Sequence, residues 1–370
     1  MTLSTGAGAA TVRMPWHRER PAVNQEPVNG AFPLREARAL VGDPMTPKPL
    51  IYWADFLFHI ILGWAAFAAA LGAQQASAWQ ISFCVIAGFS LYRAAIFIHE
   101  LAHLKKGTFR LFRFAWNVLC GIPLLIPSFT YDGVHINHHK RDVYGTKNDG
   151  EYLPFATRKP IGMIGYVFLS FLLPLLFAGR FLVLTPLSYL IPSLRKVIWR
   201  RASSLTIDLA FQRPEEAVRN DQHWRLQEFA TWLFVTAVAA SVALGFLTDR
   251  VVVLWYVISV FIFCLNSLRT LAAHAYRNPG DRRLDIAEQY LDSIDVPGNL
   301  FITALWAPVG LRYHATHHLF PNLPYHNLGK AQRRLHQELS GRSYCRTTLR
   351  SSLGAALWHI WREAKCANGR

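Results

Sequence analysis

The chain has 370 residues, of which 52% are hydrophobic and only 17% charged, with a formal net charge of +16. Charged residues are thus scarcer than the roughly 25% found in soluble domains, and the apolar residues gather into blocks long enough to cross a membrane. The composition therefore excludes an ordinary soluble protein. Nucleic-acid binding is a poor explanation of the charge, because Lys and Arg lie mainly between the apolar blocks.

Three regions are predicted along the chain. Residues 1–48 are rich in Pro, Gly, Ala and charge and contain no apolar signal-peptide core, which predicts a flexible cytoplasmic arm. Residues 49–340 form a membrane domain with a cytoplasmic cap, and residues 341–370 form a cytoplasmic tail.

Two hairpins of apolar blocks predict four transmembrane helices. The first hairpin pairs Leu50–Ala73 with Trp79–Ile98, and the second pairs Glu228–Leu247 with Val251–Ala273. The other segments carry most of the basic residues, which places them and both termini in the cytoplasm. We therefore expect an all-α, multi-pass membrane bundle whose cytoplasmic cap is helical.

Two further apolar stretches are ambiguous. Prolines and arginines interrupt Phe109–Tyr131, which predicts an interfacial segment. Ile161–Ile191 contains Arg180 and prolines, and both of its flanks are basic, so it crosses an even number of times. At about 1.5 Å per residue it is too short for two helices across a core of roughly 30 Å. A re-entrant or surface-lying pair is therefore preferred, and six spans are the alternative.

Two opposite charges lie inside predicted spans. Asp55 is in the first span, and Arg93 is at a similar depth in the second. Because charges within a membrane are generally paired or functional, we expect these two side chains to form an ion pair that braces the second helix.

Nine of the 15 histidines fall at four places that the predicted topology puts at one membrane face. They form one H-x-x-x-H pattern, two H-x-x-H-H patterns and a single residue at the end of the last span: His99 and His103; His135, His138 and His139; His314, His317 and His318; and His274.

These spacings favour a metal site. Positions i, i+3 and i+4 of a helix share a face, so each pattern turns its imidazoles toward one point. A single histidine near a helix end is more often structural, but clusters of neutral imidazoles are typical of metal sites. Nine ligands exceed the four that zinc takes and suit two ions of higher coordination number, with iron the natural choice for oxygen chemistry.

The first pattern also reads H-E-x-x-H, as in zinc peptidases, where the Glu activates water. An intramembrane zinc protease using His99, Glu100 and His103 is therefore a remote alternative. It leaves seven clustered histidines unexplained, the Leu-Asp-Gly motif of such peptidases does not occur, and the helical period turns Glu100 away from the histidine face.

Three histidine runs occur in order: "HELAH", "HINHH" and "HATHH". The second continues as "HHKRDVYGTKNDGEY" and the third as "HHLFPNLPYHNLGKAQRRL". Together they resemble the membrane fatty acid desaturase/hydroxylase superfamily over roughly residues 50–340. The resemblance implies a non-haem di-iron enzyme that uses O2 to attack an unactivated C–H bond of an acyl chain. The runs after the histidine patterns favour a desaturase that forms a C=C bond. A hydroxylase, ketolase or alkane-type monooxygenase on the same scaffold is the alternative.

The resemblance also implies roles for individual residues. The nine histidines named above would bind the two irons, with no assignment to one ion or the other. Thr270 stands where one branch of the family has an Asn one turn before the single histidine. Because metal-bound histidines usually donate their second N–H to a neighbour, we expect five residues close behind the ligands: Asp149, Glu151, Thr270, Asp292 and His326.

Such chemistry needs two electrons per turnover. The sequence contains no Cys-x-x-Cys spacing, flavin fingerprint or cytochrome b5 haem motif, so a separate donor of the ferredoxin or cytochrome b5 type is expected. The other expected partners are the membrane and a lipid with an acyl chain, and no nucleic acid.

Overall fold

The computed structural model describes residues 32–42, 46–105, 107–214, 222–280, 282–340 and 342–369. Within these ranges the chain is helical, and the only β-type pairings are isolated bridges such as that between His274 and Ser293. This confirms the predicted all-α membrane bundle.

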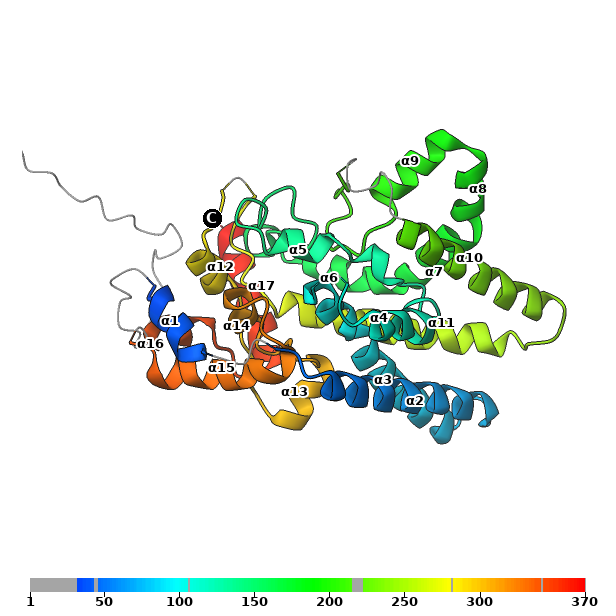
Figure 1. Cartoon of the computed structure of the whole chain (residues 1–370), viewed down its shortest axis with the longest axis horizontal. Helices are drawn as coiled ribbons and strands as arrows, with labels where there is room; N and C mark the ends of the chain where they lie inside the picture. The colour runs from blue at the N-terminus through cyan, green and yellow to red at the C-terminus, as the bar shows by residue number, and fades with distance from the viewer. Residues whose placement is uncertain are drawn as a thin grey trace, which may run out of the picture.

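Four long apolar helices match the two predicted hairpins. They are α2 (Pro49–Gly72), α3 (Ala78–His103), α10 (Gln222–Ala243) and α11 (Arg250–Leu271), and each is long and apolar enough to cross a membrane. The α2 and α3 helices pack together along their length, and α3 also packs against α11. In Figure 1 the far ends of α2, α10 and α11 lie opposite the end that carries the short C-terminal helices.

A fifth helix of sufficient length and apolarity, Leu173–Leu190, lies in the stretch expected to be re-entrant. It consists of α7 (Leu173–Gly179), a π-helical turn η6 (Arg180–Leu184) and α8 (Thr185–Leu190).

The depth of Arg180 favours a surface-lying arrangement of this fifth helix. Arg180 Nη2 lies 2.6 Å from the Glu228 carboxylate, only six positions after α10 begins at Gln222, or about 9 Å along its axis. Arg180 is therefore at the depth of the first turns of α10, and not midway across the membrane. Figure 1 shows α8 standing across the direction of α10.

The remaining helices connect the spans or form the cap. They are α1 (Leu34–Val41), α4 (Arg110–Trp116), η2 (Asn117–Gly121), η3 (Ser128–Thr130), α5 (Val134–His138), η4 (Phe155–Thr157), α6 (Ile161–Phe168), η5 (Leu169–Phe171), α9 (Pro192–Arg201), α12 (Ile286–Asp292), α13 (Leu300–Trp306), α14 (His314–Leu319), α15 (Tyr325–Glu338), α16 (Arg342–Thr348) and α17 (Leu353–Asn368). Figure 1 shows α1, α12, α14, α15 and α16 gathered at one end of the molecule.

Helix α1 differs from the expectation of a flexible arm over residues 1–48. It buries Ala37 and Val41, and the Glu36 carboxylate accepts a 2.8 Å hydrogen bond from the Ser340 backbone N–H. The apolar face of α1 thus packs against α15, which lies far away in the sequence. Residues 1–31 lie outside the described part of the chain.

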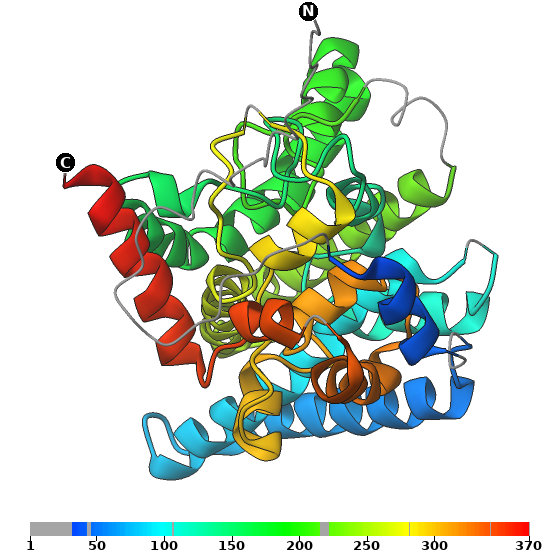
Figure 2. The same ribbon diagram turned by 90° about the vertical axis from the view of Figure 1, so that its left-hand side faces the viewer.

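The C-terminal residues pack onto the membrane domain. Helix α17 contacts α11, buries Ile360 and Ala364, and carries Glu363, whose carboxylate lies 2.7 Å from the Arg277 guanidinium. Figure 2 shows α17 along one side of the molecule and α2 along another. The predicted boundary at residue 340 is therefore not a break in the packing.

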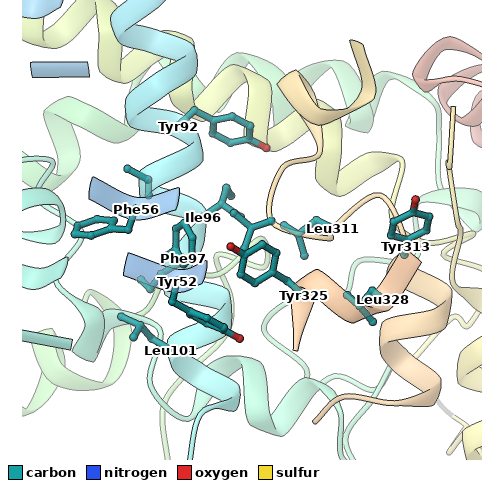
Figure 3. Packing of buried hydrophobic residues seen from close by; sticks show 14 of the residues in the cluster. Tyr52, Phe56, Tyr92, Ile96, Phe97, Leu101, Leu311, Tyr313, Tyr325 and Leu328 are labelled. Atoms are coloured by element: carbon teal, nitrogen blue, oxygen red, sulfur yellow. The ribbon is translucent and has the colours of Figure 1, made fainter. Parts of the chain in front are cut away.

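The predicted Asp55–Arg93 ion pair is confirmed. Arg93 donates two hydrogen bonds to the carboxylate, of 2.7 and 2.6 Å, in the bidentate geometry that suits a guanidinium. The Tyr325 hydroxyl donates a third, at 2.9 Å, so α2, α3 and α15 meet at Asp55. Figure 3 shows Tyr325 beside Tyr52 and Phe97 in this core. The network fixes helix α3, whose end carries the first two histidines.

Candidate metal centre

Local helical geometry directs the nine histidines inward from four chain segments. His99 and His103 end α3, and the second pattern begins in the short helix α5. The third pattern occupies α14, and His274 follows α11 directly. Seven of the nine side chains are buried, and His103 and His139 are half-buried.

The histidines form two groups, a division that the sequence did not provide. In the first group, one ring nitrogen from each of His99, His103, His135 and His317 lies within 4.8 Å of the others. His139 adjoins this group, because its Nε2 is 3.0 Å from the Nε2 atoms of both His135 and His317.

The second group contains His138, His274, His314 and His318, also with ring nitrogens within 4.8 Å of one another. His314 Nε2 lies 2.9 Å from that of His274 and 3.2 Å from that of His318. The rings of His139 and His318 are 4.3 Å apart between centroids, so the two groups are adjacent.

The donor set fits two metal ions. Metal–nitrogen bonds of about 2.0–2.1 Å at roughly right angles put neighbouring nitrogens about 3 Å apart, as observed here. Both ring nitrogens of His99 and the Nε2 of His103 are buried without a hydrogen-bond partner among the described residues, an arrangement that is costly unless something binds them.

Electrostatics favour neutral imidazoles at this site. Burial, followed by the proximity of other imidazoles, holds the pKa values of six histidines well below their ordinary range: His135, His139, His274, His314, His317 and His318. Neutral imidazole has the free lone pair that a metal needs.

Two carboxylates from one loop orient the second histidine pattern. His135 Nδ1 lies 2.6 Å from Glu151, and His138 Nδ1 lies 2.8 Å from Asp149. The backbone N–H groups of Gly145 and Glu151 donate to Asp149 and hold it in place. Burial raises the pKa of Glu151 to about 7. Burial alone would lower the pKa of His138, but the neighbouring Asp149 carboxylate outweighs it, and the pKa of His138 is raised. Because Nδ1 is used in this way, Nε2 of each ring is left available to bind a metal ion.

A tyrosine relay supports His274. Its Nδ1 lies 2.9 Å from the Tyr144 hydroxyl, which donates at 3.1 Å to Asp292. Tyr152 donates to the same carboxylate oxygen at 2.7 Å, and Ser293 Oγ is 3.1 Å from His274 Nδ1. Burial raises the pKa of Asp292 to about 6. Sequence reasoning found Asp292 but missed the two tyrosines, although both lie in the run after the second histidine pattern.

Asp295 is a second residue that the sequence did not reveal. Its side chain is fully buried and accepts hydrogen bonds from the Thr316 backbone N–H at 3.1 Å and hydroxyl at 2.7 Å. It thereby fixes α14, the helix that carries three histidines. No spacing rule distinguishes it from an ordinary loop acid.

Glu100 is turned away from the histidine groups, as the helical period predicts. Its carboxylate accepts hydrogen bonds from the Tyr52 hydroxyl and from the Tyr325 backbone N–H. Its nearer oxygen is 3.8 Å from His99 Nδ1. Glu100 therefore links α3 to α2 and α15, and it is not placed as the water-activating base of a zinc peptidase.

Two of the five residues expected behind the ligands are not brought to them. Thr270 is buried and its carbonyl accepts a hydrogen bond from Tyr276, but no bond from Thr270 to a histidine ring is present within the described chain. His326 accepts a 3.3 Å hydrogen bond from the Lys48 backbone and packs against Tyr52, on the side of α15 that faces α2.

Replacing Asp149 by asparagine is expected to weaken metal binding by about 10–100-fold, because the substitution removes the charge that polarises His138 but keeps the side chain's shape. Metal retained during titration with a chelator measures the effect. Asp142→Ala is the matched control, since Asp142 is exposed in the same loop. Equal retention by the two variants would show that Asp149 does not support a ligand.

Comparison with known proteins relates this geometry to a family. The fatty acid desaturase family profile matches residues 76–348, a range that includes all nine histidines. A ceramide hydroxylase of Caulobacter vibrioides (strain NA1000 / CB15N) is 41% identical over 334 residues, which cover 90% of this chain and 94% of the relative.

Proposed function

Because the chain belongs to the fatty acid desaturase family, and is therefore a multi-pass membrane oxidoreductase, we propose that it is a di-iron hydroxylase that adds one oxygen atom from O2 to a hydrocarbon chain of a ceramide-type lipid. The similarity to the Caulobacter ceramide hydroxylase carries this proposal, since it extends over nearly the whole of both chains. It supports the hydroxylase alternative over the desaturase that the sequence motifs favoured.

The nine histidines would hold the two irons. His99, His103, His135, His139 and His317 would bind one, and His138, His274, His314 and His318 the other. Five imidazoles around one site exceed the four ligands of tetrahedral zinc, which favours iron. The irons would supply the oxygen activation that breaks an unactivated C–H bond.

The protein's own residues would set the geometry for that chemistry. Asp149, Glu151 and the Tyr144–Asp292 relay hold the imidazoles in one tautomer and orientation. The burial of seven histidines excludes bulk water from the reacting centre. The lipid chain would approach from the membrane side.

Hydroxylation and desaturation have different stoichiometries. Hydroxylation takes a C–H bond, O2, two electrons and two protons to an alcohol and one water. Desaturation breaks two neighbouring C–H bonds with the same O2, two electrons and two protons, and returns an alkene and two waters. Both need a donor, which we propose to be a separate protein of the ferredoxin or cytochrome b5 type. The distribution of Lys and Arg supports a cytoplasmic position for the site and both termini.

Lipid mass spectrometry tests the proposal. The full chain is expressed with an electron donor in a host supplied with ceramide, with His317→Ala as the inactive control. We expect a ceramide heavier by one oxygen that is absent from the control. A ceramide lighter by two hydrogens would establish desaturation instead, and oxidation confined to free fatty acids or phospholipids would overturn the substrate class.

A further inference from the structure

A groove of about 610 Å³ lies between α8, which follows the π-helical turn at Arg180, and α10. Tyr189 and Leu190 of α8 form one wall, and Arg225, Leu226, Phe229 and Trp232 of α10 form the other. Its volume is within the roughly 300–1,000 Å³ of pockets that bind small ligands. The groove involves none of the histidines.

The α10 wall changes from polar to apolar along its length. Arg225, Phe229 and Trp232 follow one another at spacings of four and three residues, so they share one face of the helix. Arg225 lies in the first turn of α10, whereas Phe229 and Trp232 lie deeper in this membrane helix. This order of side chains, basic near the start of the helix and aromatic deeper along it, is complementary to an amphiphile whose polar end lies at the membrane surface.

Positive charge is in excess at the polar end. Glu228 is fully buried between two arginines, at 2.6 Å from Arg180 and 2.9 Å from Arg195, so one carboxylate faces two guanidiniums. The Arg195 guanidinium also lies 4.1 Å above the ring of Tyr189, which lines the groove. Arg225 is exposed and makes no side-chain hydrogen bond or ion pair with another residue in the described ranges. Among these four residues of the described chain, three guanidiniums thus accompany one carboxylate, and this excess of positive charge complements an anion.

We propose that this groove binds one membrane phospholipid with an anionic headgroup. One acyl chain lies against Leu226, Phe229 and Trp232, and the phosphate is held by Arg225 with Arg195 beside it. A zwitterionic lipid would not neutralise the surplus charge, and inorganic phosphate would leave the apolar wall unused. The site is independent of the proposed hydroxylase activity.

Native mass spectrometry of the full chain in detergent tests the site, with phosphatidylglycerol, phosphatidylcholine, ceramide and inorganic phosphate as separate probes. The wild type is expected to retain phosphatidylglycerol more tightly than phosphatidylcholine. Arg225→Gln should weaken retention of phosphatidylglycerol by about fivefold, as expected for one basic residue at an anionic membrane surface. Leu226→Trp, which adds bulk to an exposed position in the groove, should lower retention further.

Arg158→Gln is the matched control, because it removes one exposed arginine that precedes the apolar helix α6, away from the groove. It should retain phosphatidylglycerol as the wild type does. Equal losses in the two arginine variants, or equal binding of phosphatidylglycerol and phosphatidylcholine by the wild type, would overturn the proposal. Displacement of the bound phospholipid by an equal concentration of ceramide or phosphate would also overturn it, in favour of a substrate path or a simple anion site.

Discussion

Replacing His317 by alanine is expected to lower the bound metal from the proposed two irons per chain to about one or fewer and to reduce lipid oxidation by well over 100-fold. His317 belongs to the first histidine group, and its Nε2 lies 3.0 Å from that of His139. Losing a ligand should exceed the 10–100-fold effect of losing a residue that only supports one. Metal analysis of the purified variant and lipid mass spectrometry measure the two effects.

His326→Ala provides the control for this experiment. His326 is close in sequence to the third histidine pattern, yet it contacts Lys48 and Tyr52 instead of the two groups. It should keep both irons and most of the activity. Two irons retained by His317→Ala, or a single zinc in the wild type, would contradict the assignment of the centre.

Glu228→Ala is expected to lower the free energy of unfolding by about 3–5 kcal/mol, because it leaves buried cationic groups without their carboxylate. The Glu228 side chain is completely buried, and that of Arg180 is only 4% exposed. The denaturation midpoint in detergent, followed by circular dichroism, measures the change.

Arg195→Ala should be much less harmful, with a cost of about 1 kcal/mol or less, because Arg195 is more exposed and its loss leaves the Arg180–Glu228 pair intact. The double variant Arg180→Leu with Glu228→Leu should recover much of the lost stability, because only the more exposed Arg195 is then left without its carboxylate. If Glu228→Ala were as stable as Arg195→Ala, the buried network would not stabilise the broken helix.

The histidine motifs identify the superfamily but do not distinguish a desaturase from a hydroxylase. Desaturation and hydroxylation share the removal of a hydrogen from a C–H bond, so both need the same histidines at the same spacing. The histidine patterns therefore predicted the superfamily, which the family match confirms. The runs after them favoured a desaturase, and only similarity over nearly the whole chain supported a hydroxylase.

The sequence by itself determined the two long hairpins, the nine clustered histidines and the Asp55–Arg93 pair. Each depends on a regular local property: apolar blocks, helical spacing, or equal depth in neighbouring antiparallel helices. The arrangement of the histidines within four short segments made a metal site predictable before any contact was known.

Tertiary structure alone decided which histidines share a group, because that depends on how α5 and α14 pack against the ends of α3 and α11. It also decided that Tyr144 and Asp295 support the centre, that His326 does not, and that α1 docks on α15. These contacts join residues far apart in the chain, and no periodicity encodes them. A buried carboxylate or hydroxyl is identified by the partner it meets, and that partner is known only when the chain has folded.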